Sequence, residues 1–321
     1  MTKVYVVTPN FGINFLPKYF ESLYSQTYAD FKLVFVDNTL DQSAINYVNK
    51  NCKSFLKQMI VIKNEQNNSF TKTTNQGIYE AMKDKECKYI ISLNNDVILD
   101  KNFIKELVDC AEKHPTAGSI QSLMLWGDTG LIDNVGLEFS KNGMGFAKGG
   151  YEKYSPKKYN REEEILGCCA GACLYSTKAL KKIEFKNNTK QIFDDRFGAY
   201  YDDFDVAFRL QWAGFKAFYA PKAIVRHFKN VNQTNQKIYF TTRNYTLNWY
   251  KNLSAKFIWT HLHLILITEL IQIVYNIVKL KFIVLKAKFH AYWTIINMPK
   301  LFKKQVDFKQ IEKWFILKWK V

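Results

Sequence analysis

Two acidic segments of this 321-residue chain have the residue types and spacing needed to bind a cation and to move a proton. The first, Asn94-Asn95-Asp96, directly follows an apolar run and offers amide and carboxylate oxygens, which are ligands that Mg²⁺ and Mn²⁺ prefer. The second holds Asp202, Asp203 and Asp205 within four residues, where like charges repel unless a cation or a substrate hydroxyl compensates. The sequence thus predicts a divalent-cation site at Asp96 and a general base in the second segment.

Both segments also have structural interpretations. Asn-Asn-Asp is a common turn and helix-cap sequence. The helix macrodipole stabilises an Asp at a helix N-terminus, which accounts for one of the three acids. Asp205 and Arg209 are four residues apart, so we predict an ion pair between them that leaves Asp202 and Asp203 for chemistry. His227 ends a predicted strand and becomes a metal ligand only if the fold brings it near Asp96.

Alternating strand and helix patterns predict how these residues are positioned. Apolar runs typical of strands buried on both faces occur at 3–8, 32–37, 58–63 and 89–93, with helical spacing at 15–25, 41–55 and 73–83. This alternation predicts a parallel α/β sheet with right-handed crossovers. Ligands of such sheets bind beyond the carboxyl ends of the strands. There the sequence places Thr8-Pro9-Asn10, Asp37-Asn38 and Asn94-Asn95-Asp96.

The positive charge is concentrated at the C-terminal end. Residues 251–321 contain 13 lysines and three acidic residues, so they carry +10 of the net charge of +17. These lysines alternate with apolar stretches, above all at 257–278, which favours a surface for anionic lipid over nucleic acid. Because Glu269 lies near the middle of that stretch, we favour a helix lying in the membrane interface over one that spans it. Packing of this helix on the rest of the protein is the alternative.

The order of these segments resembles glycosyltransferase family 2, particularly its rhamnosyltransferase-like branch. The resemblance extends over about residues 3–228 and depends on several short motifs taken together. They are Val-Val-Thr-Pro-Asn-Phe at 6–11, Val-Phe-Val-Asp-Asn at 34–38, Asn-Gln-Gly-Ile at 75–78, Leu-Asn-Asn-Asp-Val at 93–97, Gly-Ala-Cys-Leu at 171–174, Asp-Asp-Phe-Asp at 202–205 with Arg209, Ala-Gly-Phe at 213–215, and His227.

The resemblance implies an α/β protein of the GT-A fold. Residues 1–100 would form a Rossmann-like, nucleotide-binding, mostly parallel sheet, and residues 101–230 the acceptor-binding, catalytic half. Beyond the resemblance, the charge and the apolar stretches predict that residues 231–321 form a helical, basic and apolar region associated with a membrane. A dTDP- or UDP-linked sugar donor, Mn²⁺ or Mg²⁺ as cofactor and inversion at the anomeric carbon are implied as well.

By position, the resemblance also assigns roles. Asp203, with Asp202 beside it, matches the catalytic base, and Asp96 and His227 match the metal ligands. The residues that match contacts to the nucleotide sugar are Thr8, Pro9, Asn10, Asp37, Asn75, Asn94 and Asn95. Those that match the sugar pocket are Gly171, Ala172 and Asp205.

These features together predict an enzyme at the cytoplasmic face of the cell membrane. It would transfer a sugar to a saccharide or lipid-linked acceptor in cell-surface polysaccharide synthesis, and rhamnosyl transfer is one such reaction. Asn94 stands where the family usually has Asp, which motivates a second hypothesis, a catalytically inert nucleotide-sugar-binding scaffold. The charge of +17 motivates a third, a nucleic-acid-binding protein. No nucleic-acid motif is present, so we expect no such partner.

Overall fold

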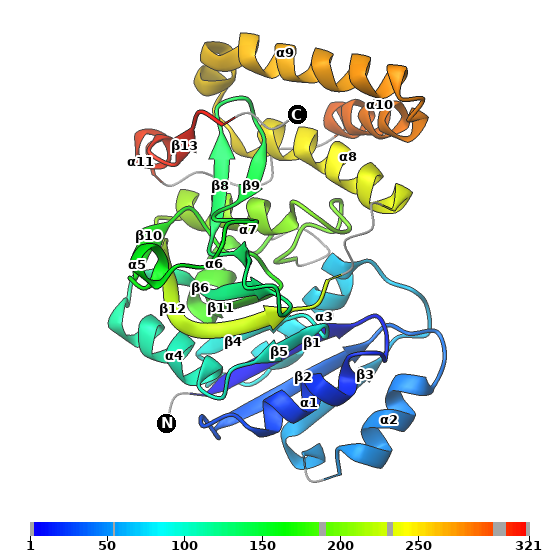
Figure 1. Cartoon of the computed structure of the whole chain (residues 1–321), viewed down its shortest axis with the longest axis vertical. Helices are drawn as coiled ribbons and strands as arrows, with labels where there is room; N and C mark the ends of the chain where they lie inside the picture. Colours follow the sequence, from blue (N-terminus) through cyan, green and yellow to red (C-terminus); the bar gives the residue numbers. More distant parts are fainter. Residues whose placement is uncertain (1–2, 54, 186–190, 230–233, 298–305, 319–321) are drawn as a thin grey trace.

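The computed structural model describes residues 3–53, 55–185, 191–229, 234–297 and 306–318 of the chain. Within this part, a ten-stranded sheet forms the centre of the molecule, and helices of the C-terminal third cap one end (Figure 1). Four of the lysines in the predicted lipid-binding region lie outside the described residues, at 300, 303, 304 and 320.

The first hundred residues fold as the sequence predicts, into parallel strands that alternate with helices. The elements are β1 (Val4–Asn10), α1 (Leu16–Tyr24), β2 (Phe31–Asp37), α2 (Ser43–Asn51), the 3-10 helix η1 (Leu56–Gln58), β3 (Met59–Lys63), α3 (Phe70–Met82) and β4 (Tyr89–Leu93). Strands β3, β2, β1 and β4 lie side by side, each parallel to its neighbour. Asn10, Asp37 and Asn94 therefore meet at one edge of the sheet.

Helices cover both faces of this sheet, because alternate strand residues point to opposite sides. The helices that follow are α4 (Phe103–Lys113), α5 (Pro156–Tyr159), α6 (Thr177–Ile183) and α7 (Asp202–Trp212). Val4 and Val6 belong to the core shared with α1, α2 and α4, whereas Tyr5 and Val7 belong to the core shared with α3, α6 and α7. Gly77 of α3 packs so closely on β1 that a Cβ there would lie 2.4 Å from Val7 Cγ1.

The second half of the sheet is mixed, unlike the parallel first half that was predicted for residues 1–100. Its strands are β5 (Val97–Leu99), β6 (Ala117–Trp126), β7 (Ile132–Asn134), β10 (Glu163–Ile165), β11 (Ala172–Ser176) and β12 (Lys216–His227). After the long excursion that follows β6, β11 enters the sheet in reverse between β4 and β6. This antiparallel register pairs Ala172 with Leu93, so the segment before β11 lies beside the polar residues that follow β4.

Three helices cap the end of the molecule that lies away from β2 and β3 (Figure 1). They are α8 (Asn235–Asn252), α9 (Ala255–Val278) and α10 (Phe282–Ile296). The expectation of helices up to the C-terminus is wrong over 306–318, where the short helix α11 (Lys309–Glu312) precedes strand β13 (Phe315–Ile316). This strand pairs in parallel with β8 (Leu137–Ser140), which is also antiparallel to β9 (Gly145–Ala147).

The C-terminal region shares its core with the catalytic half. Phe257 of α9 and Phe315 of β13 pack with Phe139 of β8 and with Phe204 and Phe208 of α7 in one buried cluster. The stretch predicted to lie in a membrane interface is thus anchored on one side to α7, which begins at the acidic segment.

The opposite side of α9 is apolar and exposed. Of the described helices, α9 is the one long and apolar enough to cross a membrane, and 22% of its most apolar window is buried. Its Glu269 is buried and forms an ion pair of 2.6 Å with Lys288 of α10. Lys288 therefore compensates the negative charge of Glu269, the charge that makes insertion of this helix across a bilayer unfavourable.

Candidate active site

Asp96 and His227 meet at the carboxyl edge of the sheet, as the sequence predicts. Strands β5 and β12 pair antiparallel with Val97 opposite His227, which brings Asp96 beside the histidine. His227 Nε2 lies 3.2 Å from Asp96 Oδ1. On the other side of the ring, Nδ1 lies 2.6 Å from Oδ2 of Asp133 in β7. Asp133 thus orients the imidazole so that Nε2 faces Asp96.

The side chains at this corner fit a divalent cation. Asp96 Oδ1 is buried, and among the described residues its partner is the His227 ring at ion-pair distance. Burial opposes protonation of His227, but its bonds to Asp133 and Asp96 outweigh this effect and raise its pKa to about 9. A cation bound here would replace the proton on His227 Nε2, and Asp96 with His227, the latter backed by Asp133, would then form a donor set suited to Mn²⁺.

Three of the predicted nucleotide contacts form one chain of hydrogen bonds along the same edge. Asn95 Nδ2 donates to Asn10 Oδ1 at 2.5 Å, and Asn10 Nδ2 donates to Asp37 Oδ1 at 2.9 Å. Lys63 Nζ lies 2.8 Å from Asp37 Oδ2, and the Asp37 side chain is fully buried. Polar groups at the ends of β1, β2, β3 and β4 are therefore held in fixed positions around the edge where ligands of such sheets bind.

Asp203 is connected to this edge through the segment before β11. Asn94 donates its backbone N–H to the carbonyl oxygen of Gly171 at 2.9 Å, and the Asn94 side chain also packs against Gly171. The backbone N–H of Phe204 donates to Asp203 Oδ1 at 2.9 Å, and the Cys169 thiol and the Ala170 backbone lie close enough to hydrogen-bond the same carboxylate and lower its pKa. Gly171 and Ala172 thus lie between the cation corner and the acidic pair, and their role in a sugar pocket stays a prediction.

Asp202 and Asp203 differ in exposure and in ionisation. Asp203 is half-buried, and burial raises its pKa to about 6 despite hydrogen bonds that favour its ionised form. Asp202 is buried, and burial together with the neighbouring Asp203 charge raises the pKa of Asp202 well above its usual range. Near neutral pH, Asp203 is therefore the ionised member of the pair and is suited to accept a proton.

This arrangement predicts a pH-dependent effect of Cys169. Asp203 must be ionised to act as a base, so kcat/KM is expected to fall about tenfold per pH unit below pH 6. Cys169→Ala removes a hydrogen bond to the carboxylate, so the acidic limb of the pH–rate profile is expected to move to higher pH. Cys169→Ser keeps a donor and is the control. If the acidic limb of the pH–rate profile stays at the same pH in Cys169→Ala, the Cys169 thiol does not affect the group that accepts the proton.

The backbone before Asp202 has an unusual conformation that α8 stabilises. Tyr200 and Tyr201 have φ values of 65° and 61°, in the left-handed region that non-glycine residues rarely adopt. Asn244 of α8 is buried, and its Nδ2 donates to the carbonyl oxygens of Phe197, Ala199 and Tyr200 at 2.7, 2.7 and 2.9 Å. Asn244, which lies outside the predicted catalytic half (residues 101–230), therefore positions the loop that carries Asp202 and Asp203.

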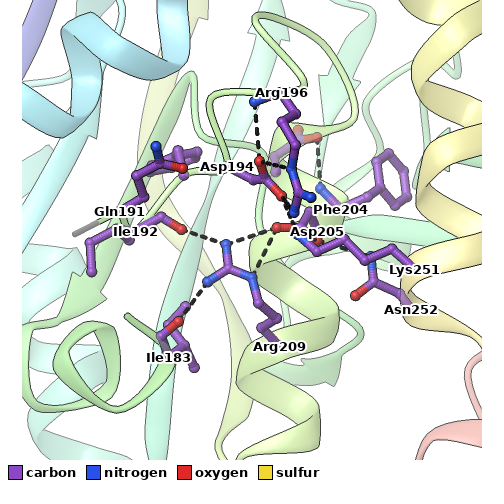
Figure 2. Close-up of polar contacts among 12 residues, drawn as sticks. Ile183, Gln191, Ile192, Asp194, Arg196, Phe204, Asp205, Arg209, Lys251 and Asn252 are labelled. Atoms are coloured by element: carbon purple, nitrogen blue, oxygen red, sulfur yellow. Dashed lines mark hydrogen bonds and ion pairs between the residues drawn. The ribbon is translucent and has the colours of Figure 1, made fainter. Parts of the chain in front are cut away.

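A buried ionic network also stabilises the loop before Asp202 (Figure 2). Lys251 Nζ of α8 lies 2.7 Å from Asp194 Oδ2 and 2.6 Å from Asp205 Oδ1. Asp205 also pairs with Arg209 at 2.8 Å, which confirms the predicted ion pair. The Asp205 carboxylate is fully buried and bound to these cations and to Asn252, so its oxygens are occupied inside the protein, and its place in the sugar pocket stays a prediction.

Two predicted nucleotide contacts have their polar groups engaged inside the protein. Asn75 donates to the Phe193 carbonyl oxygen and accepts from the backbone N–H groups of Ile192 and Phe193, so its amide holds this loop against α3. The Thr8 hydroxyl is buried and hydrogen-bonded to the Tyr19 hydroxyl of α1. Pro9, also buried, lies opposite Val36 within the parallel ladder. Of the β1 residues in this prediction, Asn10 is the one bonded to the other edge residues.

This sheet, with its polar carboxyl edge, is the GT-A fold of glycosyltransferases. The crystal structure of GalNAc-T7 with UDP, GalNAc and Mn²⁺ aligns with a TM-score of 0.55 and 13% identity, over 81% of this chain. TarS 1–349 of S. aureus in complex with UDP aligns with a TM-score of 0.52 and 14% identity, over 82% of this chain and 69% of that one. This chain spans 54% of the GalNAc-T7 chain, about half its length.

The chain belongs to Glycosyl transferase family 2, whose family model matches residues 4–184, more than half of the sequence. No curated protein sequence matches it. The match confirms the family resemblance predicted from the motifs at the ends of the strands.

Proposed function

We propose that this protein is a metal-dependent, inverting glycosyltransferase that uses a nucleotide-sugar donor. The observation that carries the proposal is the connection of Asp203, through Ala170 and Gly171, to the edge that holds Asp96 and His227. A partly exposed base and a cation corner then lie on either side of one short segment. This is the arrangement that a single displacement at a sugar carbon requires, with a base for the acceptor and a cation for the leaving group.

Each part of the edge has a role in this reaction. Asp96 and His227 would hold the divalent ion, which neutralises the charge of the departing diphosphate. Asn10 and Asp37 would orient the nucleoside, with Asn94 and Asn95 beside the diphosphate. Asp203 would accept the proton of the acceptor hydroxyl. One base acting from the acceptor side predicts inversion at the anomeric carbon.

The nucleotide of the donor is proposed to be UDP or dTDP. The structural neighbours crystallised with UDP share the fold and are the support for this choice. Rhamnosyl transfer rests on the sequence motifs and is proposed on them alone. A lipid-linked or other saccharide acceptor in the synthesis of a cell-surface polysaccharide, such as O-antigen, capsule or lipooligosaccharide, completes the proposal.

The test is thermal stabilisation of the purified protein by UDP-, dTDP- and GDP-sugars, each with Mn²⁺ and with EDTA. A ligand that binds only the folded state at 100 times its Kd adds about 2.7 kcal/mol of stability. We expect stabilisation by one nucleotide class, dependent on Mn²⁺ and lost in Asp96→Asn. Absence of stabilisation by every donor would contradict the proposal and favour an inert scaffold. Equal stabilisation with EDTA would contradict the metal site.

We also propose that the protein lies at the cytoplasmic face of the cell membrane. The support is the exposed apolar side of α9 and α10, where Leu266, Leu270, Phe289 and Trp293 are each more than half exposed. The lysines in the turn between the two helices would interact with anionic headgroups.

Substitution on this surface is expected to weaken membrane binding without unfolding the protein. The double variant Leu266→Glu/Leu270→Glu places two charges on side chains that are 56% and 62% exposed, so binding to vesicles of phosphatidylcholine and phosphatidylglycerol is expected to fall at least tenfold. Leu40→Glu, at a site 72% exposed between β2 and α2, is the control. Unchanged co-sedimentation with vesicles would refute the membrane-binding surface. Truncation before α9 is unsuitable, because Phe257 belongs to the shared core.

A further inference from the structure

A cavity of about 290 Å³ lies between the start of α7 and helices α8, α9 and α10. Tyr201, which lines it, directly precedes the acidic pair in the chain. The cavity therefore borders the loop that carries Asp203, on the side of the C-terminal helices. None of the roles proposed above uses this cavity.

Its lining has the chemistry of a saccharide site. Tyr201, Tyr245 and Tyr275 contribute aromatic rings, which pack against the C–H faces of sugar rings. Gln272 and Asn276 of α9 contribute amides that both donate and accept hydrogen bonds, as sugar hydroxyls require. A cavity with apolar walls and a few convergent polar groups is typical of a small-molecule site.

One cation stands at the solvent side of the cavity. Lys281 lines the cavity and is also exposed, and no carboxylate of the described residues lies within ion-pair distance of it. It follows Leu280, whose φ of +54° is unusual for a leucine, in the turn between α9 and α10. By contrast, Lys288 inside the helix pair is engaged by Glu269 at 2.6 Å. Lys281 is thus free to bind an anionic ligand.

Apolar side chains flank this cation. Val278 and Leu280 are each 72% exposed, and Phe282 is 63% exposed. They continue the apolar surface of α9 and α10 up to the cavity. A ligand with an anionic group at Lys281 can therefore extend in one direction into an aromatic and amide-lined cavity, and in the other along an apolar surface.

We propose that this cavity binds the head of a lipid-linked acceptor, a saccharide joined to its lipid by phosphate. The saccharide enters beside Tyr201, the phosphate pairs with Lys281, and the lipid lies along the apolar surface of α9 and α10. This inference rests on the proposed function, because it places the acceptor beside Tyr201, in the loop that carries the base that the function requires. It makes the C-terminal helices part of the substrate site.

The test measures binding of the full-length protein to three kinds of phosphatidylcholine vesicle. The first contains no other lipid, the second contains phosphatidylglycerol, and the third contains a polyprenyl diphosphate carrying one hexose at the same total negative charge as the second. We expect at least tenfold tighter binding to the third than to the second. Equal binding to the second and third would overturn the proposal, since it would show attraction to anionic lipid in general.

Two pairs of variants identify the site. Lys281→Glu and Lys279→Glu make the same change of charge in the same exposed turn, but Lys279 does not line the cavity. Thr242→Trp fills the cavity, and Thr260→Trp, on the exposed side of α9, is its control. The preference for the third vesicle is expected to disappear in Lys281→Glu and Thr242→Trp and to persist in both controls. Equal effects of the two lysine variants would overturn the proposal.

Donor binding separates this inference from the proposed function. The same preparations are tested for thermal stabilisation by the nucleotide sugar with Mn²⁺, which involves the opposite side of the Asp203 loop. Stabilisation without a vesicle preference would refute the acceptor cavity and leave the glycosyltransferase proposal intact. A vesicle preference without stabilisation would refute the donor site and leave the cavity as a lipid-phosphate site.

Discussion

Asp203→Asn is expected to lower the rate of sugar transfer by about 10²- to 10⁴-fold, the usual contribution of a general base. The amide keeps the shape of the carboxylate and cannot accept the proton of the acceptor hydroxyl. Asp203 contacts the segment before β11 and makes no contact with the edge residues Asn10 and Asp37. Thermal stabilisation by the donor should therefore remain, and steady-state kinetics of transfer measures the loss.

Asp202→Asn is the matched control for this substitution. Burial and the neighbouring Asp203 charge raise the pKa of Asp202 well above its usual range, so replacing its carboxyl group by an amide of the same shape should have a much smaller effect on the rate. An equal loss in the two variants would show that the acidic pair acts as a unit or that it only maintains the loop. Simultaneous loss of donor stabilisation in Asp203→Asn would assign Asp203 a structural role.

Lys251→Met is expected to destabilise the folded protein by about 3–5 kcal/mol, the cost of breaking a buried ion pair by removing one partner. The ammonium group lies between Asp194 and Asp205, both of which are almost completely buried. Its loss leaves two carboxylates without the cation between them, although Arg196 and Arg209 still pair with one each. Urea unfolding followed by circular dichroism measures the change in the free energy of unfolding.

Lys256→Met is the control, because Lys256 is exposed near the start of α9. A surface substitution of this kind usually changes stability by less than about 0.5 kcal/mol. If Lys251→Met cost no more than the control, the network in Figure 2 would not stabilise the fold. A stable Lys251→Met variant with reduced transfer would instead show that Lys251 only positions the loop of Asp203.

The first half of the fold and one edge of the site could be predicted because local rules determine them. Parallel strands separated by helices must end at the same edge, so the neighbourhood of Asn10, Asp37 and Asn95 follows from where the strands end. The sequence makes His227 a metal ligand only if the fold brings it near Asp96. The pairing of β5 with β12 brings the two side chains together.

The rest of the site depends on contacts between distant parts of the chain. Asp133 orients His227 from 94 residues away, and Asn244 holds the Tyr200 carbonyl from 44 residues away. Nothing in the spacing around Cys169 indicates that its thiol would reach Asp203. The reversed entry of β11, which brings these groups together, has no local signal either. The one local sign in the sequence is that Asp133 and Asn134 stand between apolar residues, Leu131 and Ile132 before them and Val135 after them.

The same distance effect applies to Asp205 and to the C-terminal stretch. Local spacing predicts the partner Arg209 of Asp205, but the second cation, Lys251, comes from a helix assigned by sequence to a separate region. The C-terminal stretch has the composition of a membrane anchor, and one side of it is nevertheless required by the core. Composition describes the exposed side of α9 and does not reveal the buried one.

The hydrogen bonds from Asn244 to the loop before Asp202 limit how this protein can be recombined with its relatives. A chimera joined after residue 228 would combine the base of one protein with the supporting helix of another. The three carbonyl oxygens that Asn244 holds, and the two carboxylates that Lys251 holds, would then lose their donors unless the incoming helix supplied an equivalent pair. Exchange of acceptor specificity between family members therefore requires α7 and α8 to be transplanted together.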